Sequence, residues 1–543
     1  MKSKLFLIVL LGLVLRLGLL SVRPLGFTWD EAALGYNAYS LLLTGKDEHG
    51  QLFPLIFKSF GDYKPGLYIY FTALPVKLLG LNEFSTRLPS AIFGTLSIIL
   101  MYILVHHLTL PAPLSKILER GGGEVEKKIG LYSSLLLAIN PWAIHFSRGA
   151  WEANLSLFLT LLGAVLFLRN KYLLSSLFFG LTFWSYQGAK LFTPSIILIL
   201  LIFNIKLINI KKLVYPLILI FLLLLPILIN LKSQSGRLQV FSVFSYRRSP
   251  EYVSQILAQD NSRIGSPVYY LFHTEAFDQF RGIAQRFLNH LSPRYLFIDG
   301  DWSNPRHSIV YHGYFYYFEA LTLVLGIIFL VRFYPRVFWL LVFWIIAAIT
   351  PSALSRDIIS GVRSLPEVIP LTIISSCGLA WIFRHSWLTK IPLTAVIIFS
   401  LVYFSDLYLY HNSFFTARDW LSVYRSAVTL TNKFESGYDR VYFSDQLGQP
   451  YIFVLFYSQY PPGLFQQQAK FITNSGGDVG RVTSFGKYQF GPVYWPSMRG
   501  QPKTLFIGGQ YELPENDLNQ PGLLRLGDIK YPNGELGFRL VGT

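Results

Sequence analysis

Long apolar runs separated by short polar segments dominate the first 410 residues. A transmembrane helix needs about 20 predominantly apolar residues, and eleven runs approach that length. They cover residues 5–22, 88–108, 129–147, 151–168, 172–188, 191–205, 214–231, 314–331, 337–354, 364–383 and 391–410. The pattern predicts an all-α polytopic membrane bundle of about 11 transmembrane helices over residues 1–410.

The basic residues predict the orientation of the spans. Lys2 and Lys4 precede the first run, and no small-residue cleavage site follows it. We therefore expect an uncleaved first span with the N-terminus in the cytoplasm. Every loop that then falls on the cytoplasmic side holds at least two basic residues, as the positive-inside rule requires. Examples are Lys116 and Arg120 in one loop and Lys211 and Lys212 in another.

A further apolar run, at 66–81, is predicted to be a helix that lies at the outer membrane interface. It contains Pro75 and Lys77. Reading it as a span would invert all later loops and move the basic ones outside. An interfacial helix keeps the charge pattern intact.

This topology leaves three segments on the outer face. The outer loops are about 23–87 and 232–313, and the first of them holds a helix-like stretch at 31–45. The tail, 411–543, alternates strand-like runs with turns and is predicted to be a small extracytoplasmic α/β domain. We expect a helix at 418–434 and strands at 440–444, 451–457 and 504–508.

Composition agrees with a membrane protein and narrows the class of partner. Hydrophobic residues make up 52% of the chain and charged residues 14%, and the net charge is +17. In a soluble chain that charge would suggest nucleic acid. Here an anionic lipid fits better, and no nucleic-acid partner is expected. The single cysteine, Cys377, excludes an intramolecular disulfide and a cysteine metal cluster.

Two acids directly after the first span are the first candidate for chemistry. A partly shielded carboxylate such as Asp30 can accept a proton from an attacking hydroxyl. Thr28 and Glu31 also have the spacing of a helix capping box, in which Glu31 serves structure. Both interpretations can hold together, with Glu31 in the cap and Asp30 facing substrate.

The second candidate is Asp62-Tyr63-Lys64-Pro65. Pro65 suits the first position of the interfacial helix. Lys64 would then lie at the N-terminus of that helix, where backbone N–H groups attract anions such as a lipid phosphate. The alternative for Lys64 is an anchor that reaches toward the headgroups.

Other polar residues fall at the outer ends of spans or in the second outer loop. At that depth a basic side chain either anchors the chain or binds phosphate. The candidates are Lys190 and Arg363 for phosphate, and Arg148, Glu152, Arg306 and His307 for substrate. His307 and His312 do not have a persuasive metal-ligand spacing, and no nucleotide-binding motif is present.

These motifs together resemble the GT-C glycosyltransferases, and most closely the protein O-mannosyltransferase-like family 39 and the aminoarabinose–lipid A transferases. The resemblance lies in the Asp30-Glu31 pair, the later Asp-Tyr-Lys64-Pro motif and the following interfacial helix. It extends to Asn82-Glu-Phe-Ser-Thr-Arg87-Leu-Pro-Ser90, Ser147-Arg148-Gly-Ala-Trp-Glu152-Ala-Asn154 and Tyr186-Gln-Gly-Ala-Lys190. It is strongest over 25–90 and covers about 1–410.

The resemblance implies a hexosyl or pentosyl transferase that uses a polyprenyl-phosphate sugar donor and usually inverts the sugar configuration. The acceptor would be a glycan, lipid or protein. It implies that Asp30 is the base, with Glu31 beside it, and that Lys64 contacts the carrier phosphate. Tyr63 replaces an acid that helps to bind zinc in aminoarabinose transferases, which argues against the same metal site. No cofactor is predicted, and a divalent metal stays an open alternative.

Two other classes compete with this interpretation. A polyprenyl-lipid transporter or flippase would need polar or broken helices at mid-membrane, and these runs are mostly unbroken. An oligosaccharide polymerase or ligase would not be expected to carry the acidic pair. A compact outer domain and no evident retention signal favour a bacterial plasma membrane.

Overall fold

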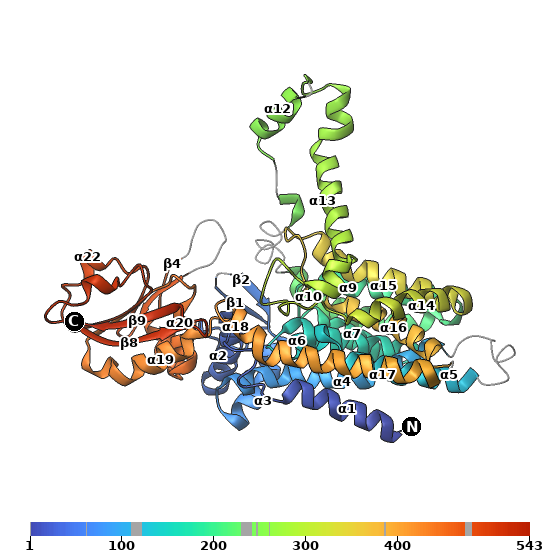
Figure 1. Cartoon of the computed structure of the whole chain (residues 1–543), viewed down its shortest axis with the longest axis horizontal. Helices are drawn as coiled ribbons and strands as arrows, with labels where there is room; N and C mark the ends of the chain where they lie inside the picture. Colours follow the sequence, from blue (N-terminus) through green and yellow to red (C-terminus); the bar gives the residue numbers. More distant parts are fainter. Residues whose placement is uncertain are drawn as a thin grey trace.

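A computed structural model gives the fold for residues 2–60, 62–109, 122–229, 242–245, 248–259, 261–384, 387–472 and 481–543. Lys116 and Arg120, which support the predicted topology, lie outside these ranges. Helices running side by side form a long bundle, and a sheet domain caps one end of it (Figure 1). The described part of the chain thus contains the predicted membrane bundle and the predicted sheet domain.

A helix occupies each of the eleven predicted runs. The bundle contains α1 (Lys2–Leu17), α4 (Glu83–Thr109), α5 (Gly122–Ile139), α6 (Pro141–Ser147), α7 (Glu152–Leu168), α8 (Tyr172–Thr182), α9 (Ala189–Asn204), α10 (Val214–Ile229), α14 (Tyr317–Phe333), α15 (Pro335–Ala353), α16 (Val368–Ile382) and α17 (Trp387–Asp406). Within the described ranges, five helices are long and apolar enough to cross a membrane, or six if the bent pair α5 and α6 is one span. The chain is therefore an integral membrane protein, and the count of 11 spans stays a prediction.

Close packing of small residues joins the inner helices of the bundle. A side chain at Gly378 of α16 would collide with the backbone oxygen of Thr322 in α14, and one at Gly326 of α14 with that of Ile374. Small residues let two apolar helices approach closely where no hydrophobic force drives them together. Nearly all of α16 is buried as a result.

The first outer loop folds as a helix, a hairpin and a second helix. It contains α2 (Trp29–Thr44), the antiparallel strands β1 (Ile56–Ser59) and β2 (Asp62–Pro65), and α3 (Leu67–Leu79). The helices expected at 31–45 and 66–81 are both present. In the described part of the second outer loop, two α-helices occur that the sequence did not predict, α12 (Pro250–Gln259) and α13 (Glu275–His290).

The tail forms a mixed sheet. Its described strands are ordered β4 (Lys470–Ile472), β5 (Arg481–Phe485), β6 (Tyr488–Phe490), β3 (Arg440–Phe443), β7 (Thr504–Gly508), β9 (Leu536–Gly542) and β8 (Leu524–Lys530). β3 is central and runs parallel to both neighbours, while the outer pairs are antiparallel. The sheet packs with α19 (Val423–Phe434), which begins five residues later than expected.

One prediction for the tail is wrong. Residues 451–457 were expected to form a strand, but Pro450–Tyr457 is a helix, α20. Continuous apolar runs of this length do not distinguish a buried strand from a buried helix. Here Pro450 begins the helix, and every residue from Pro450 to Phe456 is buried. The helix packs between α2 and α19, so it is apolar on all sides.

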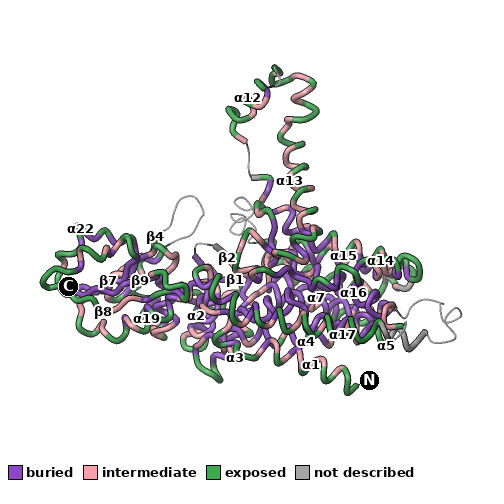
Figure 2. The backbone as a smooth tube through the Cα atoms, in the orientation of Figure 1, coloured by how far each residue is buried: buried purple, intermediate pink, exposed green. Residues whose placement is uncertain are grey.

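The sheet domain and the first outer loop share one hydrophobic core. Phe27 and Tyr36 of the loop pack in the same cluster as Phe456, Phe465 and Phe538 of the tail. The Tyr36 hydroxyl donates to the backbone oxygen of Tyr460 at 2.9 Å. Figure 2 shows continuous burial from the bundle through α2 into the sheet. The tail therefore supports the loop that holds the first candidate residues.

Candidate active site

Asp30 lies in the first turn of α2, at the end of the bundle that faces the sheet domain (Figure 1). Thr28 caps this helix, and the capping box with Glu31 is complete in both directions. The carboxyl side chain of Asp30 is 43% exposed. The cap fixes the backbone of this turn and leaves the Asp30 side chain partly exposed to solvent.

Glu31 is buried and fully engaged. Its two carboxylate oxygens accept hydrogen bonds from Arg87 Nε at 2.8 Å and Nη2 at 3.0 Å. They also accept the backbone N–H groups of Thr28 and Ala150. Arg87 itself is completely buried and donates further to the backbone oxygens of Gly26, Leu20 and Pro24. Glu31 thus ties α2 to α4 and to the 148–151 turn, which is a positioning role.

Lys64 reaches Asp30 from the hairpin, although not from the predicted helix end. It lies in β2, opposite Phe57 of β1, and α3 begins only at Leu67, after Gly66. Pro65 closes the strand, so the prediction that Pro65 opens the helix is wrong. The Lys64 ammonium, whose side chain is 12% exposed, forms an ion pair with the Asp30 carboxylate. The hairpin brings together two candidate residues that are 34 positions apart.

A buried acidic segment lies close to this ion pair and was missed by the sequence interpretation. Asp47 and Glu48 follow α2 and are fully buried. Asn37 donates its side-chain amide to Glu48 at 3.2 Å, and the Glu48 N–H donates to Asn37 at 2.9 Å. Burial raises the pKa of Glu48 to about 8, although Asn37 and Lys64 act to lower it. Two consecutive acids just after a helix-ending Gly45 were the available signal.

Replacing Glu48 with glutamine should reduce the pH dependence of folding stability. The pKa of Glu48 rises from 4.5 to about 8 on folding. The folded state therefore retains a proton that the unfolded state releases, and stability falls as the pH rises through this window. Between pH 4.5 and about pH 8, the free energy of unfolding should fall more in the wild type than in Glu48→Gln. The measurement is denaturant titration in detergent. Equal losses in both proteins would contradict the raised pKa.

The second outer loop supplies the opposite wall of the site. The guanidinium of Arg306 lies over the indole of Trp29, 5.3 Å from the ring centroid. Trp29 directly precedes Asp30 in the sequence. His307 Nδ1 lies 3.1 Å from the Asp301 carboxylate. The His307 ring meets Trp151 edge to face at 5.4 Å. Arg306 therefore contacts the first outer loop, while His307 packs between Asp301 and Trp151, and their role in substrate binding stays a prediction.

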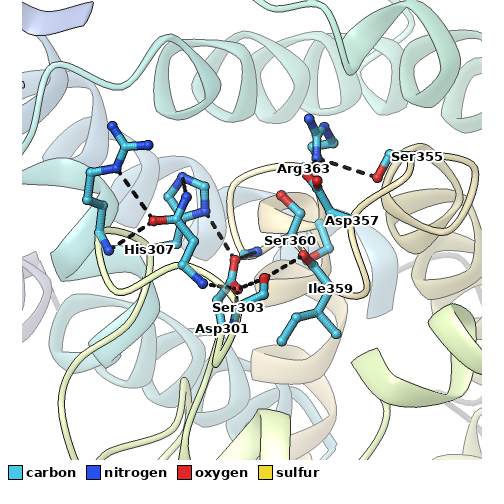
Figure 3. A network of polar contacts seen from close by, with 12 residues as sticks. Asp301, Ser303, His307, Ser355, Asp357, Ile359, Ser360 and Arg363 are labelled. Carbon is cyan, nitrogen blue, oxygen red and sulfur yellow. Dashed lines mark hydrogen bonds and ion pairs between the residues drawn. The ribbon is translucent and has the colours of Figure 1, made fainter. Parts of the chain in front are cut away.

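Asp301 organises a polar network around a cavity of about 300 Å3 (Figure 3). It accepts hydrogen bonds from the Ser303 hydroxyl at 2.7 Å and the Gly361 N–H at 2.9 Å. Burial by itself raises the pKa of Asp301, but His307, Ser303 and Gly361 together hold it below the ordinary value. The carboxylate is therefore kept ionised, and it orients His307.

Arg363 lies on the other side of the same network (Figure 3). It is paired with Asp357, and Ser355 accepts a hydrogen bond from it at 3.4 Å. Asp357 also lines the cavity beside Asp301. The 186–190 turn contacts the hairpin, because Gln187 donates to the backbone oxygen of Tyr63 at 2.9 Å. Lys190 lies in that turn, in the first turn of α9.

The remaining candidates have mixed placements. Arg148 is buried and donates to the backbone oxygens of Leu15 and Arg23 at 2.7 and 3.1 Å, so it holds the outer end of α1. Glu152 begins α7, next to the turn that contacts Glu31. Asp62 begins β2, and its side chain lies outside the described residues. No group of three or more metal-ligating side chains with suitable geometry occurs within the described ranges.

Comparison with solved structures identifies the fold. ArnT from Cupriavidus metallidurans in the apo state is 12% identical, with a TM-score of 0.53, and 99% of this chain and 98% of that chain are covered. The same enzyme bound to undecaprenyl phosphate gives a TM-score of 0.51 at the same identity and coverage. The chain therefore shares the fold of ArnT over nearly its whole length. This is the fold that the resemblance of the motifs implied.

A third similar structure is the archaeal oligosaccharyltransferase AglB from Archaeoglobus fulgidus, in complex with an inhibitory peptide and a dolichol-phosphate. It is 12% identical, with a TM-score of 0.45, and covers 84% of this chain and 63% of that chain. No protein-family model matches the sequence, and no curated protein matches it either.

Proposed function

We propose that this chain transfers a sugar from a polyprenyl-phosphate donor to an acceptor hydroxyl at the outer membrane face, with inversion. The observation that carries the proposal is the ion pair between Asp30 and Lys64, at the end of the bundle that faces the sheet domain. The reaction needs a group that accepts the proton of the acceptor hydroxyl, and the carboxylate of Asp30 can do this. It also needs a cation that binds the donor phosphate, and the ammonium of Lys64 can do this. The GT-C fold, which undecaprenyl-phosphate-bound ArnT shares, supports the same assignment.

The ion pair accounts for both halves of the reaction. Without substrate, the Lys64 ammonium forms an ion pair with the Asp30 carboxylate. A donor phosphate competes for Lys64, and the freed Asp30 carboxylate can then take the acceptor proton. The acceptor oxygen forms a bond to the anomeric carbon while the bond from that carbon to the phosphate oxygen breaks. The carrier leaves as a phosphate monoester, whose charge the cationic side chains stabilise.

Arg363 and Lys190 are the further phosphate ligands that we propose. Asp357 holds Arg363, and the turn containing Lys190 is bonded to the backbone of Tyr63. Arg306, His307 and Tyr63 would contact the sugar or acceptor: Arg306 lies against Trp29, which precedes Asp30, Tyr63 precedes Lys64 in β2, and His307 lines the cavity around Asp301. The bundle end that carries these residues would face outward, with the N-terminus in the cytoplasm and the sheet domain outside, in a bacterial plasma membrane.

A donor panel tests the proposed function directly. Membranes containing the full chain should transfer radiolabel from a polyprenyl-monophosphate sugar to an endogenous glycan, lipid or protein. They should transfer none from nucleotide sugars when synthesis of the lipid-linked donor is blocked. Membranes from cells without the chain are the control. Equal transfer from a nucleotide sugar under that block would overturn the choice of donor.

A further inference from the structure

Residues 248–290 project from the bundle as an arm. Its described parts are α12, α13 and the turns between them, and α13 runs crosswise to α4 and α17 (Figure 1). The base of α13 packs on α15, and His290 at its end is buried. If α4 and α17 cross the membrane, a helix crosswise to them runs along the membrane plane.

The α13 helix has two chemically different faces. Phe277, Phe280 and Leu288 are spaced for one face, and they are 41%, 69% and 64% exposed. Asp278 and Gln285 lie on the opposite face, which lines a pocket. An apolar face left open on a helix that lies along the membrane plane is the pattern of an interfacial helix.

The direction of each face fits a membrane surface. In Figure 1, α12 lies on the side of α13 that is nearer to the sheet domain. The polar face of α13 lines the pocket together with Arg248, which leads into α12. The apolar face therefore points the other way, toward the level of the membrane-spanning helices.

The pocket on the polar face is basic. It measures about 290 Å3, and its charged lining residues are Arg248, Arg281, Arg286, Arg356, Glu275 and Asp278. Positive charge thus exceeds negative charge by two. Asp278 is shared between Arg248 at 3.1 Å and Arg281 at 2.8 Å. The buried Nε of Arg286 has no hydrogen-bond partner within the described ranges.

We propose that the arm lies in the outer membrane interface, with the apolar face of α13 in the lipid and the phosphate of an anionic phospholipid in this pocket. Arginine is the side chain best suited to grip phosphate oxygens at several points. The pocket lies on the polar face of α13, and the apolar face lies on the side toward the membrane-spanning helices. A phospholipid could therefore place its headgroup in the pocket and its acyl chains beside the apolar face. This inference rests on the membrane-spanning fold and does not depend on the sugar-transfer proposal.

Site-specific labelling tests the position of the arm. The native Cys377 is buried, so a cysteine introduced on the arm is labelled selectively. Full-length protein with Phe280→Cys or Gln285→Cys would carry an environment-sensitive dye in nanodiscs that contain nitroxide-bearing phospholipid. The dye at 280 should be quenched strongly and the dye at 285 weakly. Equal quenching at both positions, or none at 280, would overturn the proposed placement.

Lipid binding tests the pocket. Full-length protein in detergent would be titrated with phosphatidylglycerol and with phosphatidylcholine, and bound lipid counted by native mass spectrometry. Wild type should prefer phosphatidylglycerol, and Arg281→Gln or Arg286→Gln should each weaken that binding about fivefold. Arg263→Gln, an exposed arginine on the same arm outside the pocket lining, should bind as the wild type does.

Two outcomes would count against the pocket. If Arg263→Gln weakens binding as much as the pocket variants do, the preference reflects general surface charge. If inorganic phosphate displaces the lipid at the same concentration from wild type and from Arg286→Gln, the pocket does not hold the lipid phosphate. Thermal unfolding of each variant in detergent shows whether the fold is retained. Should Arg281→Gln and Arg286→Gln both unfold, charge-retaining lysine variants at the same positions must keep the preference for anionic lipid.

Discussion

Replacing Asp30 with asparagine should lower the turnover number about 10²- to 10⁴-fold, which is the usual contribution of a general base. Asparagine has nearly the same shape, and the cap made by Thr28 and Glu31 does not involve the Asp30 side chain. The helix should therefore stay in place while the proton acceptor is lost. The measurement is transfer from labelled polyprenyl-phosphate sugar at saturating donor, with the KM for the donor determined in parallel.

The paired variant Lys64→Ala separates the two roles. Loss of the ammonium should mainly raise the KM for the donor, because Lys64 would contact its phosphate before and during transfer. Lys77→Ala, which removes an exposed lysine in the neighbouring helix α3, should leave both constants unchanged. Transfer that persists at the wild-type rate in Asp30→Asn would exclude the base assignment.

The sequence was most informative where chemistry and local structure coincide. The Thr28 to Glu31 spacing predicted a capped helix start, and the cap leaves the intervening Asp30 half exposed. The runs of apolar residues predicted every bundle helix, because hydrophobicity over that length has few other solutions in a membrane protein. The local pattern failed at 451–457, where burial on all sides removes the periodicity that distinguishes a helix from a strand.

Long-range contacts could not be predicted from sequence spacing. Lys64 was expected at a helix N-terminus, and it reaches Asp30 from a hairpin whose pairing of Phe57 with Lys64 depends on tertiary packing. The acids at 47 and 48 had no part in the sequence prediction, yet both are buried, and Gln466 of the tail donates to the backbone oxygen of Asp47 at 2.8 Å. Arg306 meets Trp29 only because loops more than 270 residues apart converge on one end of the bundle. Such contacts depend on the fold as a whole, and a single sequence does not contain a local signal for them.

Replacing Arg87 with alanine should destabilise the protein by about 3–5 kcal/mol, the usual cost of removing one partner from a buried ion pair. Arg87 is completely buried and holds both oxygens of Glu31. Its loss leaves a buried carboxylate with only the backbone N–H groups of Thr28 and Ala150. The measurement is the unfolding free energy from denaturant titration in detergent.

Two further variants distinguish this ion pair from a surface effect. Arg525→Ala removes a side chain that is 43% exposed and pairs with Asp528 and Glu515, so it should cost far less stability than Arg87→Ala, because solvent screens an exposed ion pair. The double variant Glu31→Gln with Arg87→Met should lose less stability than the sum of the two single changes, because it removes both charges together. Additive losses would show that the two side chains are not coupled.

The ion pair also fixes the first turn of α2. Arg87→Ala should therefore lower the turnover number even at temperatures where the variant stays folded, since Asp30 would no longer be held against Lys64.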